Sequence, residues 1–450
     1  MFGLLFQIEH DPGLVSHQLS TIQEPRMPSG FSPSDAHVRH GTISSVHLNA
    51  IRGAAALVVL LGHTRSLFFS SLSAMGVLSS VGQNLHQSTG SKPGLITMGN
   101  EAVIVFFVLS GYLVGGSAIR DLRNGTWSWK RYLTQRLTRL WVVLLPALLF
   151  GVAVDHSGLR MFSGTQSIYS GPPGLCIVPC NIADRVSPRV VVGNALFLQN
   201  IFVDTAGSNN ALWSLANEFW YYLAFPIGLL AVQRRQPVLR RTFYAVLLLG
   251  ITVLAGKDIF LLFFVWMLGA VLSILPLKIQ GDPLRFGTAG FAILFPVAFV
   301  LVRRAYLPIY SAEWITAICF SILFYFLLHR TEPARASVYK STADFFSRIS
   351  YTLYLVHLPL AVFLCACINT PWRHWDKSPS HLALFLLLNI VLVFFSYAFY
   401  LLFEANTDRI RRMLFSRRGP GLNPPHIVQV QAENRTPPVV PEIDVSIGCR

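Results

Sequence analysis

Apolar runs of about twenty residues recur along almost the whole chain and constrain its fold more than any other feature. A helix of this length crosses a hydrocarbon core of roughly 30 Å. Only 13% of the 450 residues are charged, which is roughly half the fraction of a typical soluble domain. The sequence therefore predicts an all-α, polytopic integral membrane helix bundle with about ten transmembrane helices. We expect spans over residues 50–72, 98–118, 140–156, 211–232, 240–256, 258–277, 286–303, 314–329, 350–370 and 382–404.

These spans divide the chain into three parts. Residues 1–45 are polar and lack a basic start followed by an apolar stretch, so we expect a disordered cytoplasmic segment and no secretory signal peptide. Residues 46–405 form the predicted transmembrane domain. Residues 406–450 begin with a basic cluster and become rich in proline, which is typical of a disordered cytoplasmic tail.

Lysine and arginine alternate in number from loop to loop, and this alternation predicts the topology. The loops after the second, fourth, sixth and eighth spans hold the larger share: Arg120, Arg123, Lys130, Arg131, Arg136, Arg139, Arg234, Arg235, Arg240, Arg241, Lys278, Arg285, Arg330, Arg335, Lys340 and Arg348. The positive-inside rule puts these loops and both termini in the cytoplasm, with the spans in the inner (plasma) membrane. The net charge of +15 is thus a topology signal rather than a nucleic-acid-binding surface.

Six cysteines are too few and too scattered for a disulfide scaffold. Cys319, Cys365 and Cys367 lie in apolar spans and are expected to pack there. Cys176 and Cys180 share a polar loop that we place on the non-cytoplasmic side, where a disulfide and two free thiols are equally open. No metal site is predicted.

Arg52 and His63 lie in the first span and are eleven residues apart, close to three helical turns. We expect them on one helix face, about 16 Å apart along the axis. A histidine in mid-membrane is suited to moving a proton near neutral pH. Arg52, at the cytosolic edge, either binds phosphate or carboxylate or only anchors the helix end.

Two further stretches face the expected cytosolic half. Ser110 and Tyr112 flank a glycine in the second span and predict a close-packing contact with two hydroxyls. Arg136 and Arg139 are three residues apart and share a helix face at the cytosolic surface. They either clamp the phosphates of a cytosolic donor or act only as topology signals, and spacing alone leaves both interpretations open.

Trp213 and Ser214 open the fourth span, and Glu218 follows about one and a half turns inside with no basic neighbour in its helix. A buried carboxylate must be paired, hydrogen-bonded or neutral. We expect His63, at comparable depth, to be its partner. The ninth span opens with Tyr354 and a second intramembrane histidine, His357.

Taken together, five elements resemble the membrane acyltransferase-3 family, which includes polysaccharide O-acetylases. They are Arg52 with ten residues before His63, the run Phe106–Tyr112, Arg136 with Arg139, Trp213-Ser214-Leu215 with Glu218, and Tyr354 with His357. The resemblance extends from about Leu48 to Glu404.

The resemblance implies an enzyme that transfers acyl groups other than amino-acyl groups. Its donor would be cytosolic acyl-CoA, usually acetyl-CoA, and its acceptor a hydroxyl of a carbohydrate or glycolipid at the non-cytoplasmic face. It thus implies O-acetylation, a polysaccharide modification of the cell envelope. Family members commonly have Asp where this chain has Asn49, so Arg52 lacks that local charge partner. The tail is too short for the esterase-like domain of some members, which predicts a stand-alone transferase or one with a separate periplasmic partner.

We therefore expect Arg52, Arg136 and Arg139 to hold the phosphates of CoA. His63, oriented by Glu218, would act as general base toward the acceptor, or toward a protein hydroxyl that carries the acyl group. The candidate carriers are Ser110, Tyr112 and Ser214. The competing hypothesis is a transporter or flippase whose buried Arg, His and Glu residues form a proton or substrate relay. No internal repeat in the sequence supports it.

Overall fold

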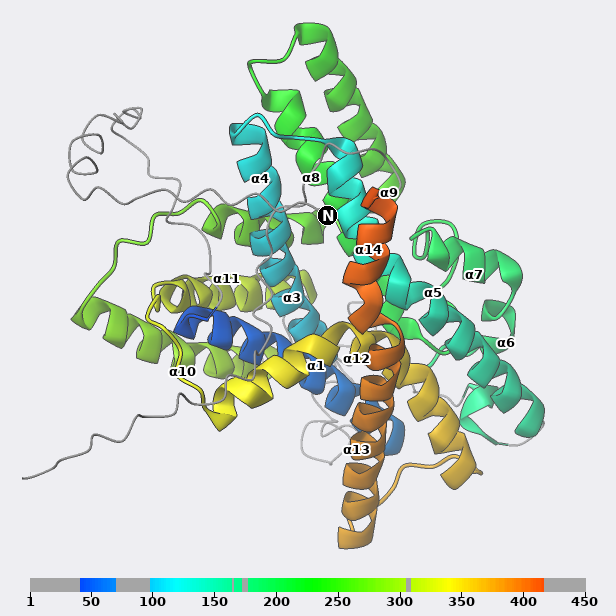
Figure 1. Cartoon of the computed structure of the whole chain (residues 1–450). Coiled ribbons are helices and arrows are strands. Elements are labelled where there is room, and N and C mark those ends of the chain that lie inside the picture. The colour runs from blue at the N-terminus through cyan, green and yellow to red at the C-terminus, as the bar shows by residue number, and fades with distance from the viewer. Residues whose placement is uncertain (1–40, 70–97, 164–165, 172–176, 305–308, 417–450) are drawn as a thin grey trace, which may run out of the picture. The chain divides into compact units, whose positions relative to one another are not determined.

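The structure, a computed structural model, describes residues 41–69, 98–163, 166–171, 177–304 and 309–416. These residues form helices, turns and connections, and none of the described residues forms a β-strand (Figure 1). The elements are α1 (Ile43–Phe68), α3 (Met98–Ser110), η2 (Gly111–Gly115), α4 (Gly116–Arg123), α5 (Trp129–Met161), η3 (Ile168–Ser170), α6 (Ile182–Arg185), α7 (Pro188–Ala195), η4 (Asn210–Leu212), α8 (Trp213–Val232), α9 (Val238–Leu272), α10 (Asp282–Arg304), α11 (Ile309–Leu328), α12 (Val338–Ile368), α13 (Pro379–Leu402), η5 (Glu404–Asn406) and α14 (Thr407–Ser416). The all-α prediction is confirmed.

Eight helical segments in the described part of the chain are long and apolar enough to cross a membrane. They are α1, the α3–η2–α4 run, η4 with α8, and the helices α5, α9, α11, α12 and α13. The fifth and sixth predicted spans are the two halves of α9, which breaks at Gly256 because this residue adopts a φ of 80° that glycine tolerates. The seventh predicted span corresponds to α10, whose side chains are described only as far as Ala298.

Several helices begin well before their apolar stretch because a serine or threonine caps them. Thr42 Oγ accepts a hydrogen bond from Ser45 N, so α1 begins at Ile43, inside the segment predicted to be disordered. Ser128 caps α5, which begins eleven residues before the predicted span, and Ser337 caps α12, which begins twelve residues before its span. These early starts place the arginines of α5 on the same helix as the apolar span.

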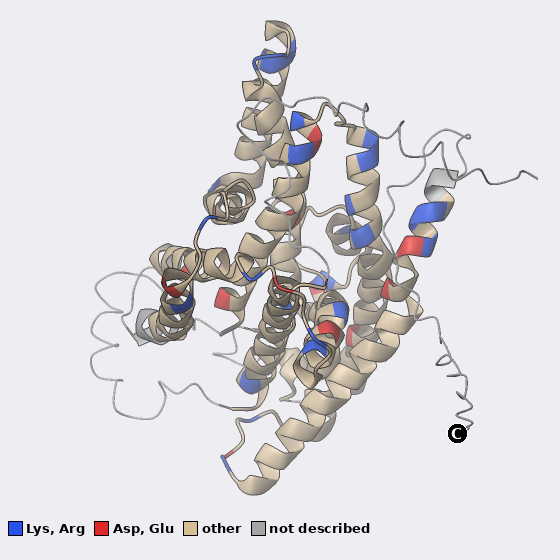
Figure 2. Ribbon diagram, turned by 60° about the vertical axis from the view of Figure 1, so that its left-hand side comes forward, with Lys and Arg blue, Asp and Glu red and all other residues tan. Residues whose placement is uncertain are grey.

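Large apolar side chains on several helices face outward. Leu149 of α5 and Phe394 of α13 are each 69% exposed. Lys and Arg lie mostly near helix ends and in connections (Figure 2), and the helical stretch from Leu382 to Leu402 of α13 carries no charged residue. Such apolar surface is unfavourable in water, whereas lipid chains accept it. These are the helices of a multi-pass membrane protein.

Helices α1 and α12 lie side by side and form the most extensive pair among the described helices (Figure 1). Gly53 makes this approach feasible, because a Cβ atom there would lie 2.6 Å from Phe346 Cβ. This pairing brings Arg52 and His63 of α1 against the residues of α12.

A second close contact joins η2 to α9. A Cβ atom on Gly111 would overlap the carbonyl oxygen of Trp266, and one on Gly269 would overlap that of Val108. Glycine on both helices therefore lets the two backbones touch. The close-packing contact predicted for the Ser-Gly-Tyr run is confirmed.

Two prolines inside helices release carbonyl groups that side chains of other elements then bind. Proline has no N–H for the carbonyl four residues earlier. In α8, Pro226 leaves Tyr222 O to accept from Tyr132 Oη at 3.0 Å. In α12, the equivalent carbonyl accepts the amide of Asn209 at 2.8 Å. These bonds connect α5 to α8 and the loop before η4 to α12.

A buried carboxylate connects α5 to the loops that follow it. Asp155 is fully buried and accepts bonds from Ser208 N at 2.7 Å, Ser208 Oγ at 2.8 Å and Tyr169 Oη at 3.3 Å. Burial, together with the neighbouring carboxylate, raises the pKa of Tyr169 above its ordinary value. Asp155 therefore anchors the segments around residues 169 and 208 to the end of α5.

The chain divides into two compact units, Met1–Thr407 and Asp408–Arg450. In the second unit, residues up to Ser416 are helical and Arg411 pairs with Asp408 at 2.9 Å. The prediction of disorder from residue 406 is therefore wrong for this stretch, while residues 417–450 lie outside the described residues. Residues 1–40 and Cys176 also lie outside the described residues. What we expect of the N-terminal segment and of the Cys176–Cys180 pair therefore stays a prediction.

Candidate active site

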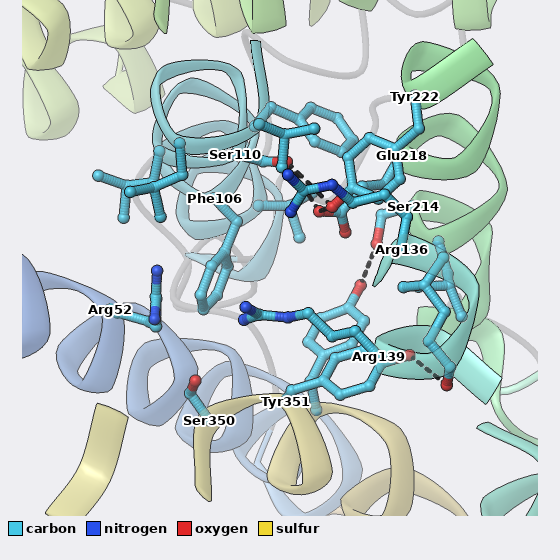
Figure 3. A pocket seen from close by; sticks show the side chains of 18 residues that line it. Arg52, Phe106, Ser110, Arg136, Arg139, Ser214, Glu218, Tyr222, Ser350 and Tyr351 are labelled. Atoms are coloured by element: carbon cyan, nitrogen blue, oxygen red, sulfur yellow. Dashed lines mark hydrogen bonds between the residues drawn. The ribbon is translucent and has the colours of Figure 1, made fainter. Parts of the chain in front are cut away.

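A pocket of about 130 Å³ lies among α1, the α3–η2 run, α5, α8 and α12 (Figure 3). Most of its apolar lining comes from α3 and η2, and most of its polar lining from α1, α5, α8 and α12. The polar lining residues are Arg52, Ser110, Arg136, Arg139, Ser214, Glu218, Tyr222, Ser350, Tyr351 and Tyr354. Residues from all five predicted motifs therefore meet at or beside one pocket.

Three guanidinium groups line this pocket, Arg52 from α1 and Arg136 and Arg139 from α5 (Figure 3). Arg136 donates a hydrogen bond of 2.8 Å to Ser117 Oγ. Arg52 interacts electrostatically with Arg139, which opposes its charge, and with Glu218, which favours it. Because three like charges in one partly desolvated pocket repel each other, the pocket is suited to an anion with several negative charges. The three arginines that the sequence groups together therefore line one pocket, and their joint action stays a prediction.

Glu218 lies on the pocket wall within a network of polar side chains. Ser110 Oγ donates to Glu218 Oε1 at 2.8 Å, and the Tyr222 hydroxyl donates to the same oxygen. Trp266 Nε1–H donates to Ser110 Oγ at 3.2 Å. Ser110 immediately precedes the π-helix η2, and π-helical turns are frequent at functional sites.

Tyr354 lines the pocket and also adjoins the buried histidines. Its hydroxyl donates to Ala211 O at 2.7 Å, so the 2.7 Å contact with Ser214 Oγ has serine as the donor. The Tyr354 ring lies 6.3 Å from the ring of His357, one helical turn further along α12. Tyr354 therefore adjoins both the pocket and the histidines.

His63 and His357 form a buried pair, only 6% and 1% exposed. His63 Nδ1 lies 2.9 Å from His357 Nε2, and the two rings stack with centroids 5.1 Å apart. His357 Nδ1 lies 2.7 Å from the carbonyl oxygen of Leu353. Neither histidine belongs to the lining of the pocket.

The predicted pairing of Glu218 with His63 is wrong. The described hydrogen bonds of Glu218 go to Ser110 and Tyr222, and that of the His63 side chain goes to His357. The physical reason is that α1 packs along α12, which supplies a closer partner for His63 than α8 does. Glu218 instead lines the arginine pocket, where its negative charge interacts with Arg52.

Two candidates pack beside the pocket rather than in its lining. Tyr112 is 3% exposed and its ring packs edge-on against Phe324 at 5.0 Å. Trp213 packs at right angles to Phe107, with ring centroids 6.2 Å apart. Ser214, the next residue, does line the pocket.

Sequence reasoning missed Glu404 and Tyr351. Glu404 Oε2 accepts from Thr352 Oγ1 at 2.5 Å and interacts electrostatically with Arg139 and Arg52. Tyr351 lines the pocket and donates to Leu140 O at 3.1 Å. A lone carboxylate at the end of the last apolar span was the available signal for Glu404, but its partners lie on other helices.

The family model for the acyltransferase-3 domain, described as an acyltransferase domain, matches residues 46–404. The chain belongs to the membrane acyltransferase-3 family. The family match supports an acyltransferase rather than the transporter hypothesis.

Two curated proteins show sequence similarity to parts of this chain. Acyltransferase MdmB of Streptomyces mycarofaciens is 30% identical over 146 residues, 32% of each chain. An uncharacterized protein of Haemophilus influenzae is 25% identical over 153 residues, 34% of this chain and 58% of that protein. The similarity thus spans about a third and somewhat more than half of the lengths of these relatives. No solved structure matches the chain.

At Asn49, where family members commonly have Asp, the side chain bonds to the neighbouring helix α12. Asn49 Nδ2 donates to Asp344 Oδ1 of α12 at 2.8 Å, and Ser347 Oγ donates to Asn49 Oδ1 at 3.2 Å. A carboxylate is therefore present one hydrogen bond away from position 49, supplied by the neighbouring helix.

Proposed function

We propose that this acyltransferase moves an acyl group, acetyl by family default, from cytosolic acyl-CoA to a hydroxyl of a carbohydrate or glycolipid at the non-cytoplasmic face. Its physiological product would be an O-acetylated polysaccharide or related glycan of the cell envelope. In this proposal the enzyme lies in the inner (plasma) membrane with both termini in the cytoplasm.

The observation that carries the proposal is the convergence of Arg52, Arg136 and Arg139 on one pocket. The 3′-phosphate and diphosphate of CoA carry several negative charges, and guanidinium groups bind phosphate oxygens through charge-assisted hydrogen bonds. A sugar hydroxyl or a neutral acceptor gives no reason for three cations in one pocket.

The spacing of the site also suits this donor. Arg52 and His63 are separated by about 16 Å along α1, and an extended pantetheine arm is about 15–20 Å long on ordinary chain dimensions. With its phosphates at the arginines, acyl-CoA would place its thioester beyond Tyr354, beside the histidine pair.

His63 would then act as the general base. It takes the proton of the acceptor hydroxyl while the hydroxyl oxygen attacks the thioester carbonyl carbon. The new C–O bond forms, the C–S bond breaks, and the leaving thiolate takes the proton back from His63. Atoms and charges balance as acyl-CoA and alcohol giving ester and CoA thiol.

The cytosolic side of the donor pocket is supported by the basic residues around it. Arg131 of α5 pairs with Asp121 of α4 at 3.1 Å, in the loop region that holds six lysines and arginines after the second span. The positive-inside rule puts this region in the cytoplasm.

The test uses the full chain in membranes supplied with radiolabelled acetyl-CoA. The proposal predicts label in the glycan or glycolipid fraction, released by mild base as expected of an ester. Mass spectrometry of glycans from cells with and without the protein should show one added acetyl mass. A folded protein that transfers label to none of the carbohydrate fractions would contradict the proposal.

A further inference from the structure

We infer that His357 is a positioning residue that holds His63 in one tautomer, with the lone pair of His63 Nε2 free for the reaction. This inference rests on the proposed function, in which His63 is the base. It goes beyond it by assigning the proton positions and the role of a second histidine.

Two hydrogen bonds connect His63 to His357 and His357 to the carbonyl oxygen of Leu353, and this carbonyl decides which atom donates in each of them. The carbonyl oxygen of Leu353 can only accept, so the 2.7 Å contact with His357 Nδ1 requires a proton on that nitrogen. A neutral imidazole carries one proton, so His357 Nε2 is then an acceptor. The 2.9 Å contact therefore requires the proton on His63 Nδ1.

The same reasoning leaves His63 Nε2 as the unprotonated nitrogen. Among the described residues, no hydrogen bond is made by this atom. It therefore carries a lone pair that can accept a proton from a substrate hydroxyl. With the opposite tautomer, His63 would present an N–H instead and could not act as a base.

The structure around His357 holds its ring firmly. The side chain is 1% exposed, stacks on His63 at an interplanar angle of 20°, and bonds the backbone of its own helix. Two residues further along α12, Pro359 leaves Leu355 O to Asn209, which ties this part of the helix to the loop before η4. The acceptor for His63 is therefore preorganised before substrate binds.

During the reaction His357 would keep its proton on Nδ1. When His63 Nε2 takes the acceptor proton, His63 becomes an imidazolium whose Nδ1–H still donates to His357 Nε2. The neutral acceptor stabilises this positive charge while the ester bond forms, and the proton then leaves from His63 Nε2 to the CoA thiolate. His357 orients and supports the base without touching the substrate, as the third member of a catalytic triad does.

The test compares His357→Leu with His357→Gln, using acetyl transfer by the full chain in membranes. Leucine removes the acceptor for His63 Nδ1–H, so we expect kcat to fall about 100-fold, within the range of general-base contributions. KM for acetyl-CoA should change less than twofold, because the arginine pocket is intact. Glutamine offers a side-chain oxygen near the position of His357 Nε2. The kcat of His357→Gln should therefore be at least tenfold higher than that of His357→Leu.

The matched control is His329→Leu. His329, directly after α11, makes the same type of contact through Nδ1, 2.9 Å to the carbonyl oxygen of Tyr325, and has no described contact with His63. This variant should keep its kcat. Equal elution in gel filtration and equal thermal unfolding would show that all variants fold.

Two results would overturn the inference while the wild type still transfers acetyl: full kcat in His357→Leu, or equal loss in the leucine and glutamine variants. A wild type without transfer would instead contradict the proposed function, so the two failures are distinguishable.

Discussion

Ser110 Oγ donates a 2.8 Å hydrogen bond to Glu218 Oε1 and thereby joins α3 to α8 across 108 residues of sequence. The same carboxylate oxygen accepts the Tyr222 hydroxyl. Glu218 is therefore fixed at the wall of the arginine pocket, where its charge interacts favourably with the Arg52 guanidinium group. The expected pairing of Glu218 with His63 is thus replaced by a position beside the arginines of the pocket.

Replacing Glu218 by Gln should strengthen donor binding. The amide keeps an acceptor oxygen for Ser110 and Tyr222 but removes the negative charge that competes with phosphate, so we expect KM for acyl-CoA to fall about tenfold. Ser110→Ala, which removes a hydrogen-bond donor without changing charge, should leave KM within about twofold. Steady-state kinetics check both, and a kcat loss of about 100-fold in Glu218→Gln with unchanged KM would assign Glu218 to catalysis instead.

The double change Arg136→Ala and Arg139→Ala should weaken donor binding. Each lost charge-assisted bond to phosphate is worth about 1.5–3 kcal/mol, so KM for acyl-CoA should rise at least tenfold with kcat reduced much less. Arg131→Ala is the control on the same helix, because its partner is Asp121 and it does not line the pocket. An equal rise of KM in all variants would mean that general positive charge, rather than this pocket, attracts the donor.

The positions of the apolar helices were predictable because hydropathy is a local property of the chain. The location of Arg52, Arg136 and Arg139 on one side of the membrane was also predictable, since it follows from the positive-inside rule. Their convergence on one pocket required the packing of α1 against α12 and of α12 against α5.

The partner of His63 was not predictable from sequence. His357 is 294 residues away, and several polar groups lay at a comparable expected depth. Only the register between α1 and α12, which depends on contacts such as that of Gly53 with Phe346, decides which of them is within hydrogen-bond distance.

Gly111→Ala should destabilise the protein. Its Cβ would overlap the Trp266 carbonyl oxygen, and backbone cannot move aside as a flexible side chain can. Overpacking of this kind costs about 1–3 kcal/mol, so the thermal unfolding midpoint in detergent should fall by several degrees. Gly250→Ala is the matched control, because no atom lies within 4 Å of a Cβ there. Equal stability of the two variants would contradict the packing described for η2 and α9.

Asn209→Ala should also destabilise the protein, because it leaves Leu355 O buried without its donor. The expected loss is about 1–3 kcal/mol in unfolding free energy. Pro359→Ala restores an N–H four residues after this carbonyl, so the cost of Asn209→Ala should shrink in that background. A double-mutant cycle measured by thermal unfolding checks this, and purely additive effects would show that the proline and the amide act independently.

The central claim, that His63 catalyses acyl transfer from a donor held at the cytosolic arginine pocket, is tested most directly in sealed vesicles of known orientation. Labelled acetyl-CoA would be supplied to one face only, with wild-type protein and with His63→Ala in parallel. We predict labelled ester on the acceptor only when wild-type protein meets acetyl-CoA at its cytosolic face, and a loss of at least 100-fold in the variant. Full transfer by folded His63→Ala, or transfer from acetyl-CoA supplied only at the opposite face, would contradict the account.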